Sequence, residues 1–366
     1  MKIQKPLAEE KYKDELDALR ESDRGSRKPD GWQLSPRAVR DFIIGADKPV
    51  CGVNIKRKFY GDDALIERAI VTLAGNRGLM LVGEPGTAKT MLSELLSAAV
   101  CGCSTNTVQG SAGTTEDNIK YSWNYAMLLS KGPVREALIP APVYNGMSKG
   151  IITRFEELTR CPLEVQDTLV SIMSDKVMNI PELTGEDGLL FAAEGFNIIG
   201  TANTRDKGVN EMSSALKRRF NFETVEPVKS VKLEAKIIRE QCESLMAESG
   251  IERAADSDAA EVLACVFSEL RSGVSSVKAS VPKLSCVMST AEAVSVYYQS
   301  ALDAEYYGNG RISMNKLTEN LLGAVMKESK DDLSKLREYY QGAVKLRAEK
   351  LGGIWQEFYD SRSCLK

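Results

Sequence analysis

A glycine-rich turn between an apolar strand and a helix places the strongest constraint on how this chain can fold. Gly78–Val82 (GLMLV) is predicted to be a short buried strand, and Thr90–Val100 is predicted to be a helix. The loop GEPGTAKT, Gly83–Thr90, joins them. Main-chain N–H groups in such a loop, together with the positive end of the helix dipole, favour a bound phosphate group. The sequence therefore predicts an α/β protein with a phosphate-binding loop.

Two side chains of this loop have the chemistry to act on a nucleotide. In the P-loop pattern, Lys89 reaches the β- and γ-phosphates and the Thr90 hydroxyl ligates Mg²⁺, so ATP and Mg²⁺ are the expected cofactors. Ala88 stands where the strict GxxxxGK[ST] pattern has its second glycine. Its methyl group is tolerable if the residue has helical dihedral angles, since only a positive φ demands glycine. The predicted nucleotide-binding residues of the loop are Gly83, Glu84, Pro85, Gly86, Thr87, Ala88, Lys89 and Thr90.

Strands and helices alternate through the middle of the chain. Gly150–Phe155 and Phe196–Thr201 are predicted as further buried strands, and Asp62–Ala74 and Leu163–Asp175 as helices. Such alternation implies parallel strands in a sheet that helices cover on both faces.

The ends of the chain are predicted to be helical. Before residue 51, Leu7–Glu21 and Ser35–Ile44 have helix-favouring patterns. After Pro227 the strand pattern fades, and the predicted helices are Lys232–Glu248, Asp258–Arg271, Cys286–Tyr306, Ser313–Lys327 and Asp331–Phe358. We therefore expect an N-terminal helical segment (residues 1–50), an α/β core (51–227), and a helical domain with a C-terminal helical extension (228–366).

Acidic and polar residues follow the other predicted strands. Glu156 and Glu157 come directly after the second strand, where Glu156, in place of the more usual Asp, would hold the Mg²⁺ shell and Glu157 would polarise the attacking water. Asn203 ends the third strand and either orients this water, contacts the γ-phosphate or serves as a turn residue. Arg218 and Arg219 either reach into a neighbouring subunit as an arginine finger or form a solvated basic pair.

Composition excludes several classes of protein. The chain has no histidine, which removes imidazole bases and histidine-ligated metal sites. Its eight cysteines are scattered without a CxxC pair, as expected of reduced thiols in the cytoplasm. No apolar run is long enough for a membrane span, and the N-terminus is too charged for a signal peptide. A formal charge of −3 gives no general attraction to nucleic acid.

Four ordered motifs resemble those of a known family. GEPGTAKT, IITRFEELTR, IIGTAN and ALKRRF occur in the order typical of AAA+ ATPases, specifically of the MoxR branch, over about residues 55–330. Two longer segments are similar to a MoxR-type subgroup found with von Willebrand factor A and SWIM zinc-finger proteins. They are VQGSAGTTEDNIKYSWNYAMLL and EELTRCPLEVQDTLVSIMSDKVMNIPEL. The resemblance implies an αβα sandwich followed by an all-helical lid domain.

The resemblance also implies how the chain assembles. Proteins of this family form rings, usually hexamers, with ATP bound between subunits. Their lid carries a sensor-2 cation, and KASVPKLSCVMSTAEAV resembles the start of the matching helix, with Lys283 where arginine is usual. Lysine cannot make the two parallel contacts of arginine. The MoxR branch carries two insertions, and two segments of this chain fit them: Gly110–Met147 and Val177–Glu194. The second is hairpin-like around Gly185. Both are expected to face the pore or a client.

Three functions are compatible with these residues. The first is a homo-oligomeric ATPase that remodels or matures a partner protein, for which the resemblance suggests one with a von Willebrand factor A domain. The second is a nucleotide-gated scaffold with little turnover, which the departures at Ala88, Glu156 and Lys283 keep open. The third is a nucleic-acid motor, which the near-neutral charge and the lack of a basic, aromatic-interleaved stripe oppose.

Overall fold

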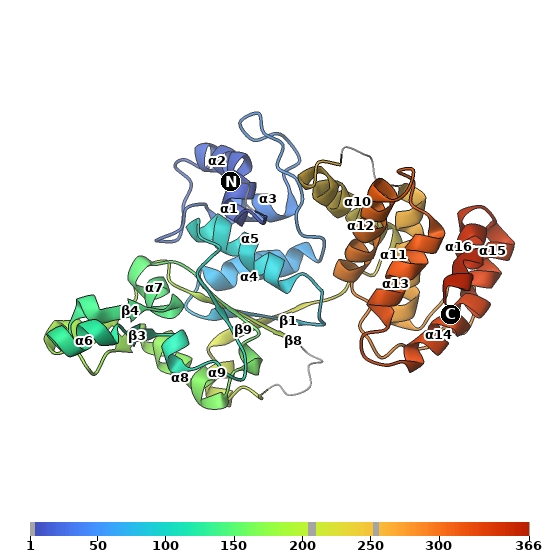
Figure 1. The fold of residues 1–366 in the computed structure, drawn as a ribbon. Coiled ribbons are helices and arrows are strands. Elements are labelled where there is room, and N and C mark those ends of the chain that lie inside the picture. The colour runs from blue at the N-terminus through green and yellow to red at the C-terminus, as the bar shows by residue number, and fades with distance from the viewer. Residues whose placement is uncertain (1–3, 204–209, 252–255, 366) are drawn as a thin grey trace. The chain divides into compact units, whose positions relative to one another are not determined.

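The computed structural model describes residues 4–203, 210–251 and 256–365 (Figure 1). The chain divides into two compact units, one made of Met1–Glu84 and Ala88–Glu226, the other of Pro85–Thr87 and Pro227–Lys366. We call them the α/β unit and the helical unit and describe each by itself. Among the helices in the described ranges, none combines the length and apolar character needed to cross a membrane.

A five-stranded parallel sheet organises the α/β unit. Its order is β2-β5-β8-β1-β9, and every neighbouring pair is parallel. Because all strands point the same way, their carboxyl ends meet at one edge, where β1 is followed by the glycine-rich loop. This arrangement confirms the predicted parallel sheet. The strands are β1 (Gly78–Gly83), β2 (Thr107–Gln109), β5 (Thr153–Glu156), β8 (Ile198–Asn203) and β9 (Phe220–Val225).

Helices cover both faces of this sheet (Figure 1). Successive side chains of a strand point to opposite faces. Leu79 and Leu81 accordingly pack with α3, α4 and α5, whereas Met80 packs in a second cluster with α7, α8 and α9. The helices are α1 (Ala8–Lys11), α2 (Lys13–Ser22), α3 (Pro36–Ile44), α4 (Asp63–Leu73), α5 (Lys89–Cys101), α7 (Pro142–Lys149), α8 (Leu163–Asp175) and α9 (Ser214–Lys217), with the 3₁₀ turn η3 (Leu158–Arg160).

The N-terminal helices share the hydrophobic core of the α/β unit. Leu16 of α2 and Phe42 of α3 are fully buried in the same cluster as Leu95 of α5. Lys58 links α2 to α3, because its ammonium group donates hydrogen bonds to Glu15 at 2.5 Å and to the Phe42 carbonyl oxygen at 2.8 Å. Burial lowers the pKa of Lys58, and the contact with Glu15 opposes that shift.

Two insertions pack against one another in the α/β unit. In the first, α6 (Tyr125–Lys131) and the 3₁₀ turns η1 (Glu116–Asn118) and η2 (Arg135–Ala137) accompany the antiparallel strands β3 (Tyr121–Trp123) and β4 (Leu138–Pro140). The second is the predicted hairpin, formed by β6 (Val177–Asn179) and β7 (Leu189–Phe191) with η4 (Gly185–Gly188) between them. Tyr121 donates to Glu182 at 2.9 Å, which joins the two insertions.

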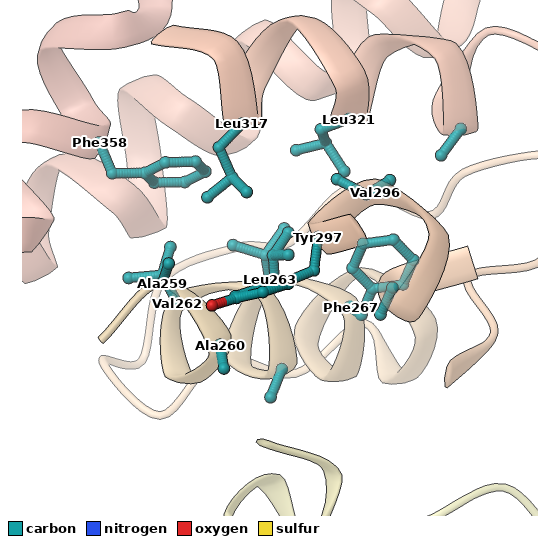
Figure 2. Packing of buried hydrophobic residues seen from close by; sticks show 14 of the residues in the cluster. Ala259, Ala260, Val262, Leu263, Phe267, Val296, Tyr297, Leu317, Leu321 and Phe358 are labelled. Atoms are coloured by element: carbon teal, nitrogen blue, oxygen red, sulfur yellow. The ribbon is translucent and has the colours of Figure 1, made fainter. Parts of the chain in front are cut away.

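The helical unit has its own core, in which α11, α12 and α13 meet (Figure 2). Phe267, Tyr297 and Leu317 are fully buried there. The elements are α10 (Val231–Glu248), α11 (Ser257–Ser272), α12 (Thr290–Tyr306), α13 (Met314–Val325), α14 (Asp331–Tyr339), the π-helix η5 (Tyr340–Val344), α15 (Lys345–Leu351), α16 (Ile354–Asp360) and the 3₁₀ turn η6 (Ser361–Cys364).

Two predicted helix boundaries in this unit are wrong. The expected helix Asp331–Phe358 is interrupted, because Gly352 and Gly353 both take positive φ angles, which a continuing helix excludes. The expected helix Cys286–Tyr306 begins only at Thr290, where the Ser289 side chain and Glu292 form a capping box. Such reciprocal bonds satisfy N–H groups that a helix start leaves without partners, and so fix the boundary.

Candidate functional site

The glycine-rich loop runs from β1 into α5, but its last residue before the helix is not helical. Ala88 has φ 65° and ψ 24°, which is the left-handed region. The assumption that Ala88 has helical dihedral angles, under which alanine was acceptable there, is therefore wrong. A side chain costs about 1–2 kcal/mol in this conformation, so Ala88 carries local strain that glycine would not. Gly86, also in the loop, has φ +75°.

Lys89, the first residue of α5, is folded back onto the loop. Its side-chain nitrogen donates to the carbonyl oxygens of Glu84, at 2.7 Å, and of Gly83, at 3.2 Å. The residue is only 6% exposed. A buried ammonium group needs such acceptors. The bonds also hold the charge beside the end of β1, where the sequence predicts a bound phosphate.

Thr90 connects the loop to the carboxylate of Glu156. The Thr90 hydroxyl donates to Glu156 Oε2 at 2.9 Å, and the Thr201 hydroxyl of β8 donates to the same oxygen at 2.8 Å. Glu156 is the last residue of β5 and is 4% exposed. The structure therefore brings Thr90 and Glu156 together, as expected if both act on one metal ion. Within the described ranges, no three acidic or cysteine side chains converge in a way that could hold a metal by themselves.

The other oxygen of Glu156 faces residues that the sequence analysis did not single out. Arg154 Nη2 and the Ser93 hydroxyl each lie 2.7 Å from Oε1. The Ser93 proton can alternatively go to the Thr90 carbonyl oxygen, which lies 2.8 Å away. An arginine in a buried apolar strand was the available signal, since arginine is almost never fully buried without a partner.

Glu157 lies just beyond the strand in a strained conformation. Its φ of 55° and ψ of 42° are left-handed, which is rare for a residue other than glycine. The Asn203 side-chain nitrogen donates to both carboxylate oxygens, at 2.9 and 3.0 Å, and Arg160 Nε lies 3.4 Å from Oε2. Glu157 N donates to Thr201 Oγ1 at 3.0 Å. Strain of this kind concentrates at functional sites, where surrounding contacts enforce it.

A cysteine also lies near this turn. Cys161 is fully buried, and burial raises the pKa of its thiol although Thr114 and Ser111 oppose the shift. The thiol is therefore protonated at neutral pH and is a poor nucleophile.

The two arginines at the end of α9 differ. Arg219 donates to the Ser174 hydroxyl at 2.8 Å and to the Ala215 carbonyl oxygen at 3.0 Å. Arg218 is exposed and makes no side-chain hydrogen bond or ion pair with the residues that the structure describes. Of these two arginines, Arg218 has the guanidinium group that can reach another molecule without loss of a contact to the described residues.

Lys283 belongs to the helical unit and is an exposed residue in a segment without regular structure. The helix whose start it was expected to mark begins seven residues later, at Thr290. The local geometry therefore does not place Lys283 at a helix N-terminus, and its predicted role stays a prediction. Pro85, Gly86 and Thr87 lie in the loop between β1 and α5.

Both units match known family models. Residues 78–220 match the AAA domain of the dynein-related subfamily, and residues 232–366 match the YehL-like AAA+ ATPase C-terminal domain. YehL of Escherichia coli (strain K12), described as an uncharacterized protein, is 48% identical over 360 residues, which cover 98% of this chain and 97% of YehL. The uncharacterized protein SH1500 of Staphylococcus haemolyticus (strain JCSC1435) is 28% identical over 170 residues, 45% of this chain and 62% of that protein.

A solved structure shares the fold. NtrX from Brucella abortus, crystallised in complex with ADP, aligns with a TM-score of 0.50 and 12% sequence identity, covering 84% of this chain and 70% of NtrX. At this identity the likeness concerns the fold alone.

Proposed function

Since this chain belongs to the YehL-like AAA+ ATPases, we propose that it binds ATP and hydrolyses the bond to the γ-phosphate. The observation that carries the proposal is the hydrogen bond from Thr90, at the end of the glycine-rich loop, to Glu156. The next residue, Glu157, accepts a hydrogen bond from Asn203. These residues come from the ends of two neighbouring strands, β5 and β8, and from the helix after the loop. Together they supply a phosphate cradle, a metal ligand and a base, which are the parts that phosphoryl transfer to water needs.

Lys89 and the loop bind the nucleotide. The loop N–H groups at the start of α5 donate hydrogen bonds to phosphate oxygens. The Lys89 ammonium group exchanges its two carbonyl bonds for bonds to phosphate, which are stronger because the acceptor is charged. The left-handed Ala88 turns the chain from the loop into α5.

Thr90 is the residue that fits a magnesium ion directly. Its hydroxyl proton goes to Glu156, which leaves the hydroxyl lone pairs for a metal. Glu156 has two donors within 2.9 Å of each oxygen and acts on the metal through Thr90. Thr90 would hold a magnesium ion at this place, and the ion would supply positive charge that neutralises the charge developing on the phosphates.

Glu157 is the base that accepts a proton from the attacking water. Both of its oxygens accept hydrogen bonds from Asn203, which holds the carboxylate at the sheet edge. Water must compete with Asn203 for these oxygens. Asn203 therefore orients Glu157, and the same amide group can turn to a phosphate oxygen.

Arg218 is the preferred arginine for action on a neighbouring subunit. It is exposed and has no partner among the described residues, whereas Arg219 is bonded to Ser174 and Ala215. AAA+ proteins often oligomerise, and the resemblance to the MoxR branch supports a homo-oligomeric ring, usually a hexamer. We therefore expect Arg218→Ala to lower turnover more than Arg219→Ala.

Remodelling of a protein partner is the function that we favour for this ATPase. Supporting features are the two packed insertions with exposed apolar side chains, Leu129 at 90% and Phe191 at 66% exposure. A client with a von Willebrand factor A domain, and a place in the MoxR branch, are supported by the resemblance in the sequence alone. A nucleotide-gated scaffold with little turnover is the second candidate. Two features depart from the usual P-loop site: the strained conformation of Ala88, and the carboxylate of Glu156, each oxygen of which already accepts two hydrogen bonds.

Steady-state ATP turnover against protein concentration tests the proposal. The native chain should turn over ATP at a rate per molecule that rises with concentration. Glu157→Gln should lower turnover by about 10²–10⁴-fold while ATP still binds, because a missing base affects the chemical step. Glu164→Gln, an exposed glutamate seven residues further along, is the matched control and should match the native chain. Tight ATP binding with no turnover favours the scaffold, and absence of ATP binding contradicts both candidates.

A further inference from the structure

Arg154 is a buried cation inside the sheet, beside the residues that would act on the nucleotide. It lies on β5 two positions before Glu156, so both side chains point to the same face. Each of them is only 4% exposed. Arg154 pairs in parallel register with Thr107 of β2 and Ile199 of β8, so strands on both sides fix its backbone.

The guanidinium group of Arg154 is held from several directions. Nη2 donates to Glu156 Oε1 at 2.7 Å, and Nε donates to the Ser93 hydroxyl at 2.9 Å. Nη1 donates to the Ser104 carbonyl oxygen at 2.7 Å, and Glu94 lies 3.7 Å from Nη2. These bonds join β5 to the first turns of α5 and to the segment after it. The same contacts orient Glu156 toward Thr90.

The charge of Arg154 cancels the charge of Glu156. A carboxylate near a bound divalent cation normally attracts that cation through its full negative charge, and the attraction is strong where water is excluded. Here a guanidinium group lies 2.7 Å from the carboxylate, so the pair is neutral as a whole. A neutral pair attracts magnesium less than a lone carboxylate would.

Building on the proposed function, we infer that Arg154 is a positioning residue that holds Glu156 against Thr90 and sets how strongly magnesium contributes to nucleotide binding. Arg154 touches neither nucleotide nor metal in this role and acts through Glu156. Two properties are involved, the charge of the guanidinium group and its forked geometry. A set of variants separates them.

Binding of fluorescent N-methylanthraniloyl-ATP, measured in EDTA and in saturating MgCl₂, tests the inference without reference to turnover. The quantity compared is the dissociation constant in EDTA divided by that in magnesium. Arg154→Met leaves the pair with charge −1, Glu156→Gln leaves it with +1, and the double variant has the native sum of zero. We expect the ratio to be highest for Arg154→Met and lowest for Glu156→Gln, with the native protein and the double variant between them and steps of about tenfold per charge.

Arg154→Lys separates charge from geometry. It keeps the positive charge, so its ratio should stay near the native one. It lacks the fork that reaches Ser93, Ser104 and Glu156 together, so its thermal stability should fall.

If Arg154→Met does not fold, because Glu156 is then buried without a cation, the ratios of the native protein and of the double variant must still lie above that of Glu156→Gln. Equal ratios in all folded variants would overturn the inference and leave the proposed function intact. A native protein that binds the nucleotide in neither solution would overturn the proposed function and the inference with it.

Discussion

The α/β unit and the helical unit each contain a buried arginine–glutamate pair. Arg154 and Glu156 are both 4% exposed, with Nη2 2.7 Å from Oε1. In the helical unit Arg347 is 3% exposed and Glu269 is 4% exposed, with the corresponding atoms 2.5 Å apart. Taking two charges out of water costs several kcal/mol per ion, and both sites offset this with additional hydrogen bonds.

The two pairs differ in what else they contact. Glu156 contacts Thr90, at the end of a loop whose groups can exchange partners with a ligand. Glu269 accepts from Tyr339 at 2.8 Å and from Ser275 at 2.9 Å, and Arg347 lies 4.5 Å from the centre of the Trp355 ring. These partners belong to the helices α14 and α16 and to the segment after α11. The same ion-pair chemistry therefore serves the site in one unit and helix packing in the other.

The largest expected effect comes from breaking the pair in the helical unit. Arg347→Met leaves Glu269 buried without its cation and should lower the free energy of unfolding of that unit by about 3–5 kcal/mol. Arg347→Met with Glu269→Gln removes both charges and should recover most of the loss. Urea unfolding monitored by Trp355 fluorescence, with Trp32 and Trp123 replaced by phenylalanine in every variant, measures both. Equal losses in the single and double variants would contradict the ion-pair explanation. Nucleotide binding distinguishes the two pairs, because Arg154→Met should change its dependence on magnesium and Arg347→Met should not.

The second expected effect is a sensitivity of the helical unit to acid. Burial acts to raise the pKa of Glu269, but hydrogen bonds from Arg347 and Tyr339 outweigh burial, so its pKa lies below the usual value. A lowered carboxyl pKa stabilises the folded state above the ordinary value of about 4.3, and this stabilisation is lost as the pH falls through the lowered pKa. The native unit should therefore lose stability more steeply below about pH 4.5 than the neutral double variant. Parallel pH profiles for the two proteins would contradict this explanation.

A smaller effect is expected at the loop of the α/β unit. Ala88→Gly removes the strain of a left-handed alanine and should raise the free energy of unfolding of this unit by about 1 kcal/mol. Ala74→Gly is the matched control, because Ala74 is exposed and right-handed at the end of α4, and glycine there should be neutral or destabilising. Chemical unfolding of both variants gives the comparison. Equal signs for the two changes would show that Ala88 is not strained.

The smallest effect concerns thiol labelling, which reports on each unit separately. Burial raises the pKa of Cys101 in the α/β unit to about 11 and that of Cys242 in the helical unit to about 12. Both should react slowly with a thiol reagent at pH 8, whereas the exposed Cys51 reacts fast. Arg347→Met should speed the labelling of Cys242 and leave Cys101 unchanged. Mass spectrometry of labelled peptides distinguishes the sites, and faster labelling of both would mean that the units do not open independently.

Periodicity was sufficient to find most elements. The predicted helix Leu163–Asp175 has the observed bounds, and the glycine-rich loop lies between β1 and α5 as expected. Boundaries set by other interactions were missed. The helix expected from Cys286 begins at Thr290 because a capping box defines its start, and the pair Gly352–Gly353 ends α15 although the pattern of apolar residues continues.

The sequence by itself determined the α/β class, the loop at the end of β1 and the acidic pair at the end of β5, because each depends on residues that are near in the chain. The tertiary structure alone decided that Ala88 is left-handed, that Arg154 neutralises Glu156, and that Arg219 rather than Arg218 has internal partners. These contacts depend on the order of the strands. Thr201 reaches Glu156, 45 positions earlier in the chain, because β8 pairs with β5. Hydrogen bonds between segments so far apart in the chain leave no local pattern in the sequence.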